Sequence, residues 1–328
     1  YAYHGIWQIG TVNEGVWKSA SVSKKIFTCF LEQGEVGVAL FFMLSGFFLI
    51  NKTRANLRKI LVQTVLWSWF SGLISFLILF TIHGGGYTGT DFLRSFIVPI
   101  NNGYWFVTVY VIICTCLPAI NPFLKGISRN QYFLLLLFFF CFEYLAAPFS
   151  GSAYANISRG FFFYVLGGFF KLFVLKPETK SVRKAILFLL LAFVFIFAET
   201  VGYYFSFLEP ASRVRSLLSF CVIKTSILVS SACFFIAFYN FEIKCFRGIN
   251  IVAASTFGVY LLHENVFARH LFWDILFDVL HKQLPSDYYM PLAFGTICCV
   301  FACCLIIDMI LQKILLKPIL KKIQSIWK

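Results

Sequence analysis

Charged side chains are scarce in this sequence. Only 13% of its 328 residues are Asp, Glu, Lys or Arg, whereas soluble domains average about 25%. Apolar residues make up 60% of the chain, and the mean hydropathy is +0.82. These values exclude a soluble globular domain and indicate a polytopic membrane protein, whose lipid-facing surface must be apolar.

Metal-binding patterns are also missing. The chain has five His and 11 Cys residues, but no pair of His residues accompanies them at a metal-ligand spacing. Most of the cysteines fall inside apolar runs, and only Cys29 and Cys245 fall in predicted loops. We therefore expect neither a metal site nor a disulfide framework, and we interpret the cysteines as small apolar packing residues.

Acidic residues are few. The chain has 14 Asp and Glu residues but 28 Lys and Arg residues, which gives a net charge of +14. In a soluble protein this excess would suggest a nucleic-acid partner. In a membrane chain, the positive-inside rule and contact with anionic lipid headgroups account for it. We therefore expect membrane lipids, and no nucleic acid, as partners.

Long apolar runs fill most of the chain. A membrane-spanning helix needs about 20 apolar residues. The candidate spans are 36–51, 60–82, 104–120, 132–149, 159–175, 185–207, 217–239, 250–272 and 291–315. The chain opens at Tyr1 with what resembles half of a further span, so we expect the true start to precede Tyr1 and the full protein to have about ten spans. The predicted fold class is an all-α, polytopic membrane helical bundle that forms a single integral-membrane domain over residues 1–328.

The basic residues predict the orientation of these spans. With a cytoplasmic amino end, eighteen of the 28 Lys and Arg residues lie in inner segments and nine in outer ones, while Lys224 lies within a span. This bias places both ends in the cytoplasm. One inner cluster, with Arg58 and Lys59, directly follows the first complete span.

Ionisable residues inside the spans are functional candidates, because they are costly at membrane depth. They are His4, Glu143, Glu199, Lys224, His263, Glu264 and Asp308. Asp308 stands four residues before Gln312 and five before Lys313, which favours a local pair on one helix. The other six lie near mid-depth or in the outer half, above basic cytoplasmic ends. This layout suits an anionic cytosolic donor that delivers a group outward.

Each of these residues also has a structural interpretation. Glu143, Glu199 and Lys224 would serve equally well as partners in salt bridges between helices. His263 and Glu264 are adjacent and would serve equally well as a hydrogen-bonded core pair. The sequence leaves both interpretations open.

The most informative segment is the apolar run that contains Phe41-Phe42-Met43-Leu44-Ser45-Gly46-Phe47. Its Gly46 lets the backbone approach a neighbouring helix or ligand closely. This string resembles the acyltransferase family 3 proteins, which are multi-spanning enzymes that move acyl groups from coenzyme A onto sugars. Further segments resemble that family in the same order, namely His4, Arg58, Tyr104-Trp105-Phe106 with Tyr110, Pro118 with Asn121-Pro122-Phe123, and Ser255 to His263.

The resemblance implies roles for particular residues. His4 falls where the family has its catalytic His, and the accompanying Arg would precede Tyr1. Arg58 and Lys59 would hold the phosphates of coenzyme A. Trp105 and Tyr110 would line a slot for the pantetheine arm.

The chemistry of acyl transfer adds further candidates. A sugar hydroxyl needs a base to take its proton, and His suits this because its ordinary pKa is about 6.5. The Ser45 hydroxyl or nearby backbone amides would stabilise the oxyanion, and His263 is a second candidate for the base. Glu143, Glu199 and Glu264 are the candidates for binding the acceptor. Direct transfer and a transient acyl-His intermediate both stay open.

These inferences predict a membrane O-acyltransferase, expected to be an O-acetyltransferase, in the bacterial cytoplasmic membrane. It would use cytosolic acetyl-CoA or another acyl-CoA as co-substrate, bind no permanent cofactor, and acylate a cell-surface or lipid-linked saccharide. The alternative is a flippase or exporter of lipid-linked saccharide, but the chain shows no internal repeat of the kind that many transporters have. A polysaccharide polymerase would need a large outer loop, and no predicted loop exceeds about 25 residues by the span-length rule.

Overall fold

The computed structural model describes residues 22–30, 33–83, 90, 104–143, 152–206, 213–241, 246–272 and 289–326. Within these ranges the regular structure is helical and no strand occurs. Helices suit a bilayer because each satisfies its backbone hydrogen bonds within its own segment. The prediction of an all-α polytopic membrane fold is confirmed.

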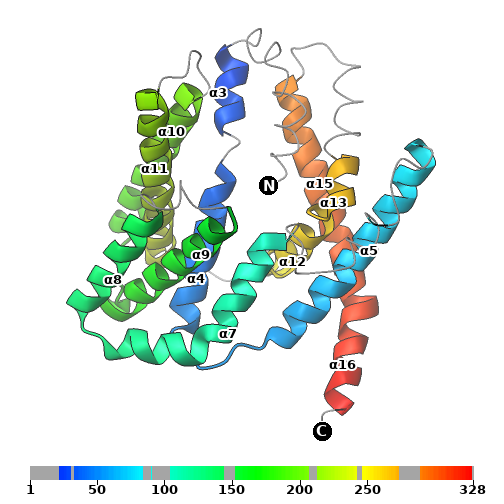
Figure 1. Cartoon of the computed structure of the whole chain (residues 1–328), viewed down its shortest axis with the longest axis horizontal. Helices are drawn as coiled ribbons and strands as arrows, with labels where there is room; N and C mark the ends of the chain where they lie inside the picture. Colours follow the sequence, from blue (N-terminus) through cyan, green and yellow to red (C-terminus); the bar gives the residue numbers. More distant parts are fainter. Residues whose placement is uncertain are drawn as a thin grey trace. The chain divides into compact units, whose positions relative to one another are not determined.

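Figure 1 shows the described helices along the chain. In chain order they are α3 (Val22–Phe30), α4 (Gly34–Leu49), α5 (Leu57–His83), α7 (Trp105–Gly126), α8 (Arg129–Cys141), α9 (Ser152–Phe169), the π-helix η5 (Phe170–Val174), the 3-10 helix η6 (Pro177–Thr179), α10 (Val182–Ser206), α11 (Arg213–Asn240), α12 (Arg247–His263), α13 (Val266–Arg269), α15 (Tyr289–Leu311), the π-helix η9 (Gln312–Leu316) and α16 (Lys317–Ile326). The predicted half-span at the start of the chain, together with His4 and Cys245, lies outside the described residues.

Six helices among the described residues are long and apolar enough to cross a membrane. They are Leu57–Ile82, Trp105–Gly126, Ala155–Val174, Val182–Phe205, Leu217–Asn240 and Phe294–Ser325. The shorter apolar helices α4 and α8 coincide with the predicted spans 36–51 and 132–149. Each of the nine predicted spans therefore overlaps apolar helix in the described part of the chain, although α4 and α8 are shorter than a full span and the span 250–272 is broken.

One difference is a break in the predicted span 250–272. The chain bends by 84° between α12, which ends at His263, and α13, which begins at Val266. The expectation of one continuous helix here is wrong. The physical reason is a set of side chains that replace the missing helical hydrogen bonds at the break, and these are described below.

The last helix and the first described one also differ from expectation. The helical path Phe294–Ser325 has 32 residues, which at about 1.5 Å per residue is about 48 Å long and exceeds a hydrocarbon core of about 30 Å. At the other end, residues expected to form a loop contain α3. Cys29 on this helix is fully buried rather than in a loop, and α3 packs against α10.

The helices fall into two compact units. Unit 1 contains α5, the first turn of α7, α12, α13, α15, η9 and α16. Unit 2 contains α3, α4, the rest of α7, α8, α9, η5, η6, α10 and α11. Each unit has its own core and its own buried polar groups.

Within unit 2, α10 lies along α11, and α4 lies against α9 (Figure 1). The contact between α4 and α9 depends on glycine from both helices. A Cβ on Gly46 would overlap the carbonyl group of Tyr164, and a Cβ on Gly167 would overlap the carbonyl group of Met43. The predicted close approach at Gly46 is confirmed, because small residues let two membrane helices touch through their backbones.

Asn121 fastens the end of α4 to α7 and α9 in the same unit. Its Nδ2 donates to the carbonyl oxygens of Leu49 and Lys52, both at 2.7 Å. Its Oδ1 accepts from Tyr164 Oη at 2.8 Å. The side chain thereby gives a second donor to the Leu49 carbonyl, which also accepts from the Lys52 backbone N–H, and it supplies a donor to the Lys52 carbonyl just beyond the end of α4.

Within unit 1, α5 packs against α12 and α13, and α12 packs against α15. A fully buried carboxylate, Asp308, lies in this core. It accepts hydrogen bonds from Trp67 Nε1 at 2.7 Å, Gln63 Nε2 at 3.3 Å and Gln312 Nε2 at 2.6 Å. The predicted local pair with Gln312 is present, and α5 adds two donors that the local spacing does not reveal.

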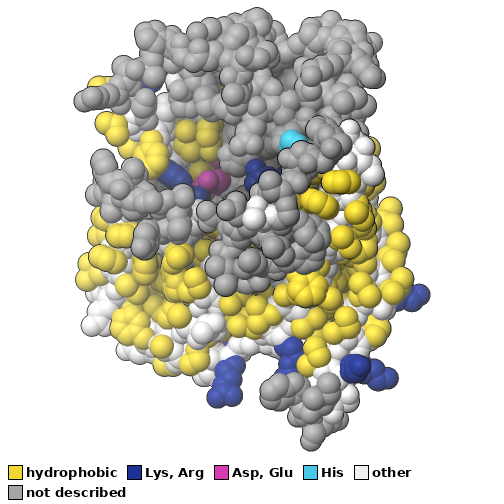
Figure 2. Space-filling model, turned by 45° about the vertical axis from the view of Figure 1, so that its right-hand side comes forward, with side chains coloured by type: hydrophobic (Ala, Val, Ile, Leu, Met, Phe, Trp, Pro, Cys, Tyr) yellow, Lys and Arg dark blue, Asp and Glu magenta, His cyan; other side chains and the backbone are white. Residues whose placement is uncertain are grey.

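The surface of the described helices is largely apolar (Figure 2). Large hydrophobic side chains such as Phe48, Leu190 and Phe197 are exposed by 60–67%. Exposed apolar area of this extent indicates contact with lipid acyl chains. The chain is thus a multi-pass membrane protein.

Candidate active site

The break between α12 and α13 is stabilised by side chains from elsewhere in unit 1, namely Tyr104, which directly precedes α7, and Ser71 on α5. Tyr104 Oη donates to the Leu261 carbonyl at 2.8 Å, and Ser71 Oγ donates to the Leu262 carbonyl at 2.5 Å. These carbonyls belong to the last turn of α12, where helical donors are missing. In an apolar surrounding, an irregular backbone persists only when such partners replace the lost bonds.

Asn265 completes the break from the other side. Its Oδ1 accepts from the Phe267 backbone N–H at 3.1 Å and so caps the start of α13. Its Nδ2 donates to the Ser68 carbonyl on α5 at 3.2 Å. Asn is a favoured residue for this capping position. The two residues between α12 and α13, Glu264 and Asn265, are therefore fixed in place rather than free to move as a loop.

His263 ends α12 with one ring nitrogen already engaged. Nδ1 lies 2.7 Å from the Val259 carbonyl oxygen. A carbonyl only accepts hydrogen bonds, so Nδ1 carries the hydrogen and the neutral ring keeps its lone pair on Nε2. The side chain is 13% exposed. This is the tautomer in which Nε2 accepts a proton from another group.

Glu264 places a buried carboxylate beside that nitrogen. Its Oε2 lies 3.9 Å from His263 Nε2, which is too far for a hydrogen bond but close enough for an ion pair when the ring is protonated. Oε1 accepts from Arg269 Nη1 at 3.2 Å, while Oε2 has no hydrogen-bond partner among the described residues. The predicted adjacency is present, but the predicted hydrogen bond within the pair is not formed. The arrangement offers a base with a stabilising carboxylate next to it.

The predicted coenzyme A residues of unit 1 lie on exposed or half-buried surface. Arg58 and Lys59 are exposed in the first turn of α5, and the Arg58 backbone N–H donates to Asn56 Oδ1 at 3.2 Å. Trp105 is half-buried at the start of α7, with its ring edge-on to Phe106 at 6.2 Å. These residues are accessible to a ligand, and their proposed roles stay predictions.

Ser45 and Tyr110 belong to unit 2. The Ser45 hydroxyl donates to the Phe41 carbonyl of its own helix at 2.8 Å. In this rotamer its hydrogen stabilises α4 and is not directed at a ligand, so a role at an oxyanion would require the hydroxyl to rotate. The Tyr110 ring packs edge-on against Phe41 at 5.2 Å.

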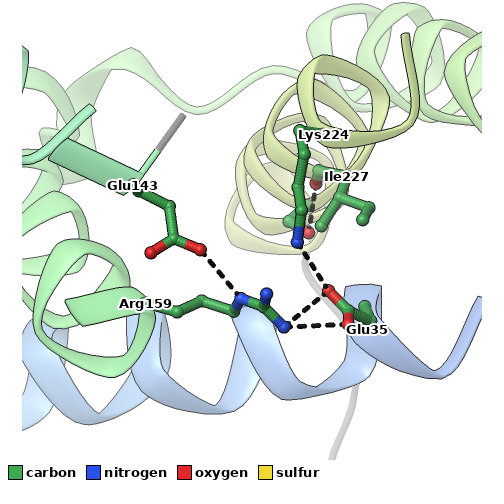
Figure 3. Close-up of polar contacts among 6 residues, drawn as sticks. Glu35, Glu143, Arg159, Lys224 and Ile227 are labelled. Atoms are coloured by element: carbon green, nitrogen blue, oxygen red, sulfur yellow. Dashed lines mark hydrogen bonds and ion pairs between the residues drawn. The ribbon is translucent and has the colours of Figure 1, made fainter. Parts of the chain in front are cut away.

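A second polar cluster joins four helical segments of unit 2, and we call it the ion network (Figure 3). Arg159 Nη1 lies 2.8 Å from both carboxylate oxygens of Glu35, and Arg159 Nε lies 3.1 Å from Glu143 Oε1. Lys224 Nζ lies 3.6 Å from Glu35 Oε2. The salt-bridge interpretation is therefore confirmed for Glu143 and Lys224. Glu199 is fully buried on α10 of the same unit.

Sequence reasoning missed Glu35 and Arg159, because it assigned both to outer segments at the ends of spans. The sequence did hold a signal for this pair, since Glu35 stands just before the apolar run of α4 and Arg159 stands just before the apolar run of α9. Since α9 begins at Ser152 and not at 159, Arg159 lies inside the helix.

Neither cluster has the composition of a metal centre. In the part of the chain that the structure describes, no group of three or more His, Cys, Asp or Glu residues is arranged to hold a metal ion. Every described cysteine is a free thiol.

Comparison with known proteins gives the family. The family model described as an acyltransferase domain, that of acyltransferase family 3, matches residues 2–309 and runs through both units. No curated protein and no solved structure matched the chain. The match covers most of the sequence, and the chain belongs to acyltransferase family 3.

Proposed function

We propose that this membrane acyltransferase moves an acyl group, expected to be acetyl, from cytosolic acyl-CoA to a hydroxyl of a cell-surface or lipid-linked saccharide. The family supplies the reaction class. The observation that carries the proposal is His263 Nε2, an unprotonated ring nitrogen beside the buried Glu264 carboxylate. A hydroxyl acceptor requires such a base, because an alcohol is a poor nucleophile until its proton is removed.

The reaction balances with groups that the proposal names. The acceptor oxygen forms a bond to the thioester carbon while its proton passes to a His nitrogen. Collapse of the tetrahedral intermediate breaks the C–S bond, and the proton passes to the departing thiolate of coenzyme A. The Glu264 carboxylate, 3.9 Å from Nε2, stabilises the imidazolium that exists between these steps.

Two histidines compete for the role of base. The family resemblance assigns it to His4, which lies outside the described residues. The geometry supports His263. Arg58 and Lys59, exposed at the start of α5, are the proposed contacts for the phosphates of coenzyme A.

A flippase or exporter of lipid-linked saccharide is the second candidate, and one observation favours it. Broken helices are common at the substrate sites of transporters, and α12 and α13 form a broken pair. The two functions differ in whether a thioester is consumed.

The test is thioester turnover by the purified protein in lipid nanodiscs. With acetyl-CoA labelled in the acetyl group and a saccharide extract from the source membrane, we expect release of free coenzyme A and transfer of label to saccharide. His263→Ala should lower this rate by about 10²–10⁴ if His263 is the base. The matched control is His270→Ala, seven residues further along. No thioester turnover together with saccharide transport would replace the proposal with the flippase.

A further inference from the structure

The bend between α12 and α13 brings together two charged residues that a straight helix would keep apart. Arg269 Nη1 lies 3.2 Å from Glu264 Oε1, although the two residues are five positions apart in the sequence. In a continuous helix, residues five apart lie about 140° from each other around the axis, so their side chains face different sides. The contact is therefore a consequence of the 84° bend after His263.

The short helix α13 fixes the backbone that carries Arg269. The Arg269 backbone N–H donates to the Asn265 carbonyl at 2.8 Å, which closes the single turn of α13. The Asn265 side chain caps the same turn and donates to the Ser68 carbonyl on α5. Arg269 thus starts from an anchored position, and its side chain reaches back to the residue that precedes Asn265.

The Arg269 side chain is not needed to hold the bend itself. Tyr104 and Ser71 already supply donors to the last carbonyls of α12, and Asn265 caps the start of α13. The Arg269 side chain is 32% exposed, and ion pairs with a partly exposed partner usually add little stability. The pair is therefore better explained by its effect on Glu264.

That effect is on the orientation of the Glu264 carboxylate. The Glu264 side chain is only 1% exposed, and its Oε1 is bound to Arg269. The other oxygen, Oε2, then lies 3.9 Å from His263 Nε2. We propose that Arg269 is a positioning residue, which holds the Glu264 carboxylate with one oxygen beside the ring that takes the proton of the acceptor. This inference rests on the proposed function with His263 as the base, and in it Arg269 affects the rate only through Glu264.

A purely structural ion pair is the competing explanation. It predicts that Arg269→Ala lowers the apparent melting temperature and leaves turnover unchanged at temperatures well below it. Positioning predicts a lower kcat with unchanged KM values for acyl-CoA and acceptor, because in this role Arg269 contacts neither substrate. We expect kcat to fall about tenfold to a hundredfold, since misplacing a group at the reacting centre by about 1 Å has effects of this size. Arg269→Lys should recover part of the loss, because Lys keeps the charge but lacks the planar geometry of Arg.

The experiment is a double-mutant cycle on turnover by the full chain in lipid nanodiscs, with labelled acetyl-CoA and the saccharide extract. The kcat and both KM values are measured for Arg269→Ala, Glu264→Gln and the double variant. Glu264→Gln keeps the shape of the side chain but removes the negative charge that stabilises the imidazolium. If Arg269 acts through Glu264, the double variant has the same kcat as Glu264→Gln alone.

Two further measurements complete the design. Arg129→Ala is the matched control, because it removes an exposed arginine at the start of α8 in unit 2, and it should leave kcat unchanged. The apparent melting temperature of every variant is recorded, so that kinetics are compared only where each protein is folded.

Three results would overturn the inference. The first is an unchanged kcat in Arg269→Ala, whatever its melting temperature. The second is a further loss in the double variant equal to the loss in Arg269→Ala, which would mean that Arg269 acts independently of Glu264. The third is full turnover by His263→Ala, which would leave Glu264 without a base to stabilise. Failure of the proposed function looks different, because the parent protein itself would then release no coenzyme A, and the inference would fall with it.

Discussion

Replacing Gly46 with Ala provides a sharp test of the packing in unit 2. An ideal Cβ at this position would overlap the Tyr164 carbonyl oxygen, and it would lie 2.8 Å from the Tyr164 carbonyl carbon and 3.1 Å from the Gly168 nitrogen. All of these are backbone atoms, which no change of rotamer can move. Overpacking a core typically costs about 1–3 kcal/mol, and we expect the upper part of that range here.

The same helix provides the matched control. Nothing lies within 4 Å of a Cβ built at Gly37 on α4. Both substitutions gain the helix propensity of Ala, worth up to about 1 kcal/mol, so only the overlap separates the two variants. The expected difference is about 2–3 kcal/mol, or roughly 3–4 °C in apparent melting temperature for a chain of 328 residues.

The assay is thermal unfolding of both variants in identical nanodiscs. Gly46→Ala should unfold at a lower temperature than the parent protein, and Gly37→Ala at the same temperature or higher. Equal melting temperatures for the two variants would refute the close contact between α4 and α9.

Further predictions concern a proposed donor site and two buried polar groups. Arg58→Ala should raise the KM for acyl-CoA about tenfold or more and leave the acceptor KM unchanged, and Arg58→Lys should recover only part of the loss. Two-substrate kinetics decide this, and an unchanged donor KM would contradict it. Asn121→Ala removes the side-chain donor to the Leu49 and Lys52 carbonyls and the acceptor of the Tyr164 hydroxyl, and it should destabilise the protein by about 1–3 kcal/mol, whereas exposed Asn130→Ala should not. Asp308→Ala removes the acceptor of Trp67, Gln63 and Gln312 and should lower the apparent melting temperature, with an unchanged value counting against the hydrogen bonds described.

The sequence predicted the helices well because hydrophobicity along a span is a local property. Most predicted boundaries fall within a few residues of the helix ends, and the special role of Gly46 followed from its position in an apolar run. The close contact with α9 confirms that interpretation. The helix boundaries and the role of Gly46 were both predicted from residues close together in the sequence, because a helix that spans a bilayer is apolar along its length.

The partners of buried polar residues were not predictable in the same way. Arg159 forms a salt bridge with Glu35, which is 124 positions away in the sequence. Trp67 donates a hydrogen bond to Asp308, which is 241 positions away. The break after His263 contains neither Gly nor Pro, the residues that usually indicate a helix break in a sequence. Such a break depends on hydrogen-bond donors that are far away in the sequence. The hydrogen bond from Ser71 to the Leu262 carbonyl, for example, joins residues 191 positions apart.

The break has a chemical consequence for His263. The Tyr260 carbonyl accepts from the Glu264 backbone N–H, and the next two carbonyls accept from the side chains of Tyr104, which directly precedes α7, and Ser71 on α5. The ring therefore stands at the carboxyl end of α12, where the aligned peptide dipoles give a partial negative charge. A proton taken by Nε2 creates a positive ring, which this helix end and the Glu264 carboxylate 3.9 Å away both stabilise. An unbroken helix would place His263 within a helix rather than at its carboxyl end, and the proposed role of His263 as a base draws on this position at the bend.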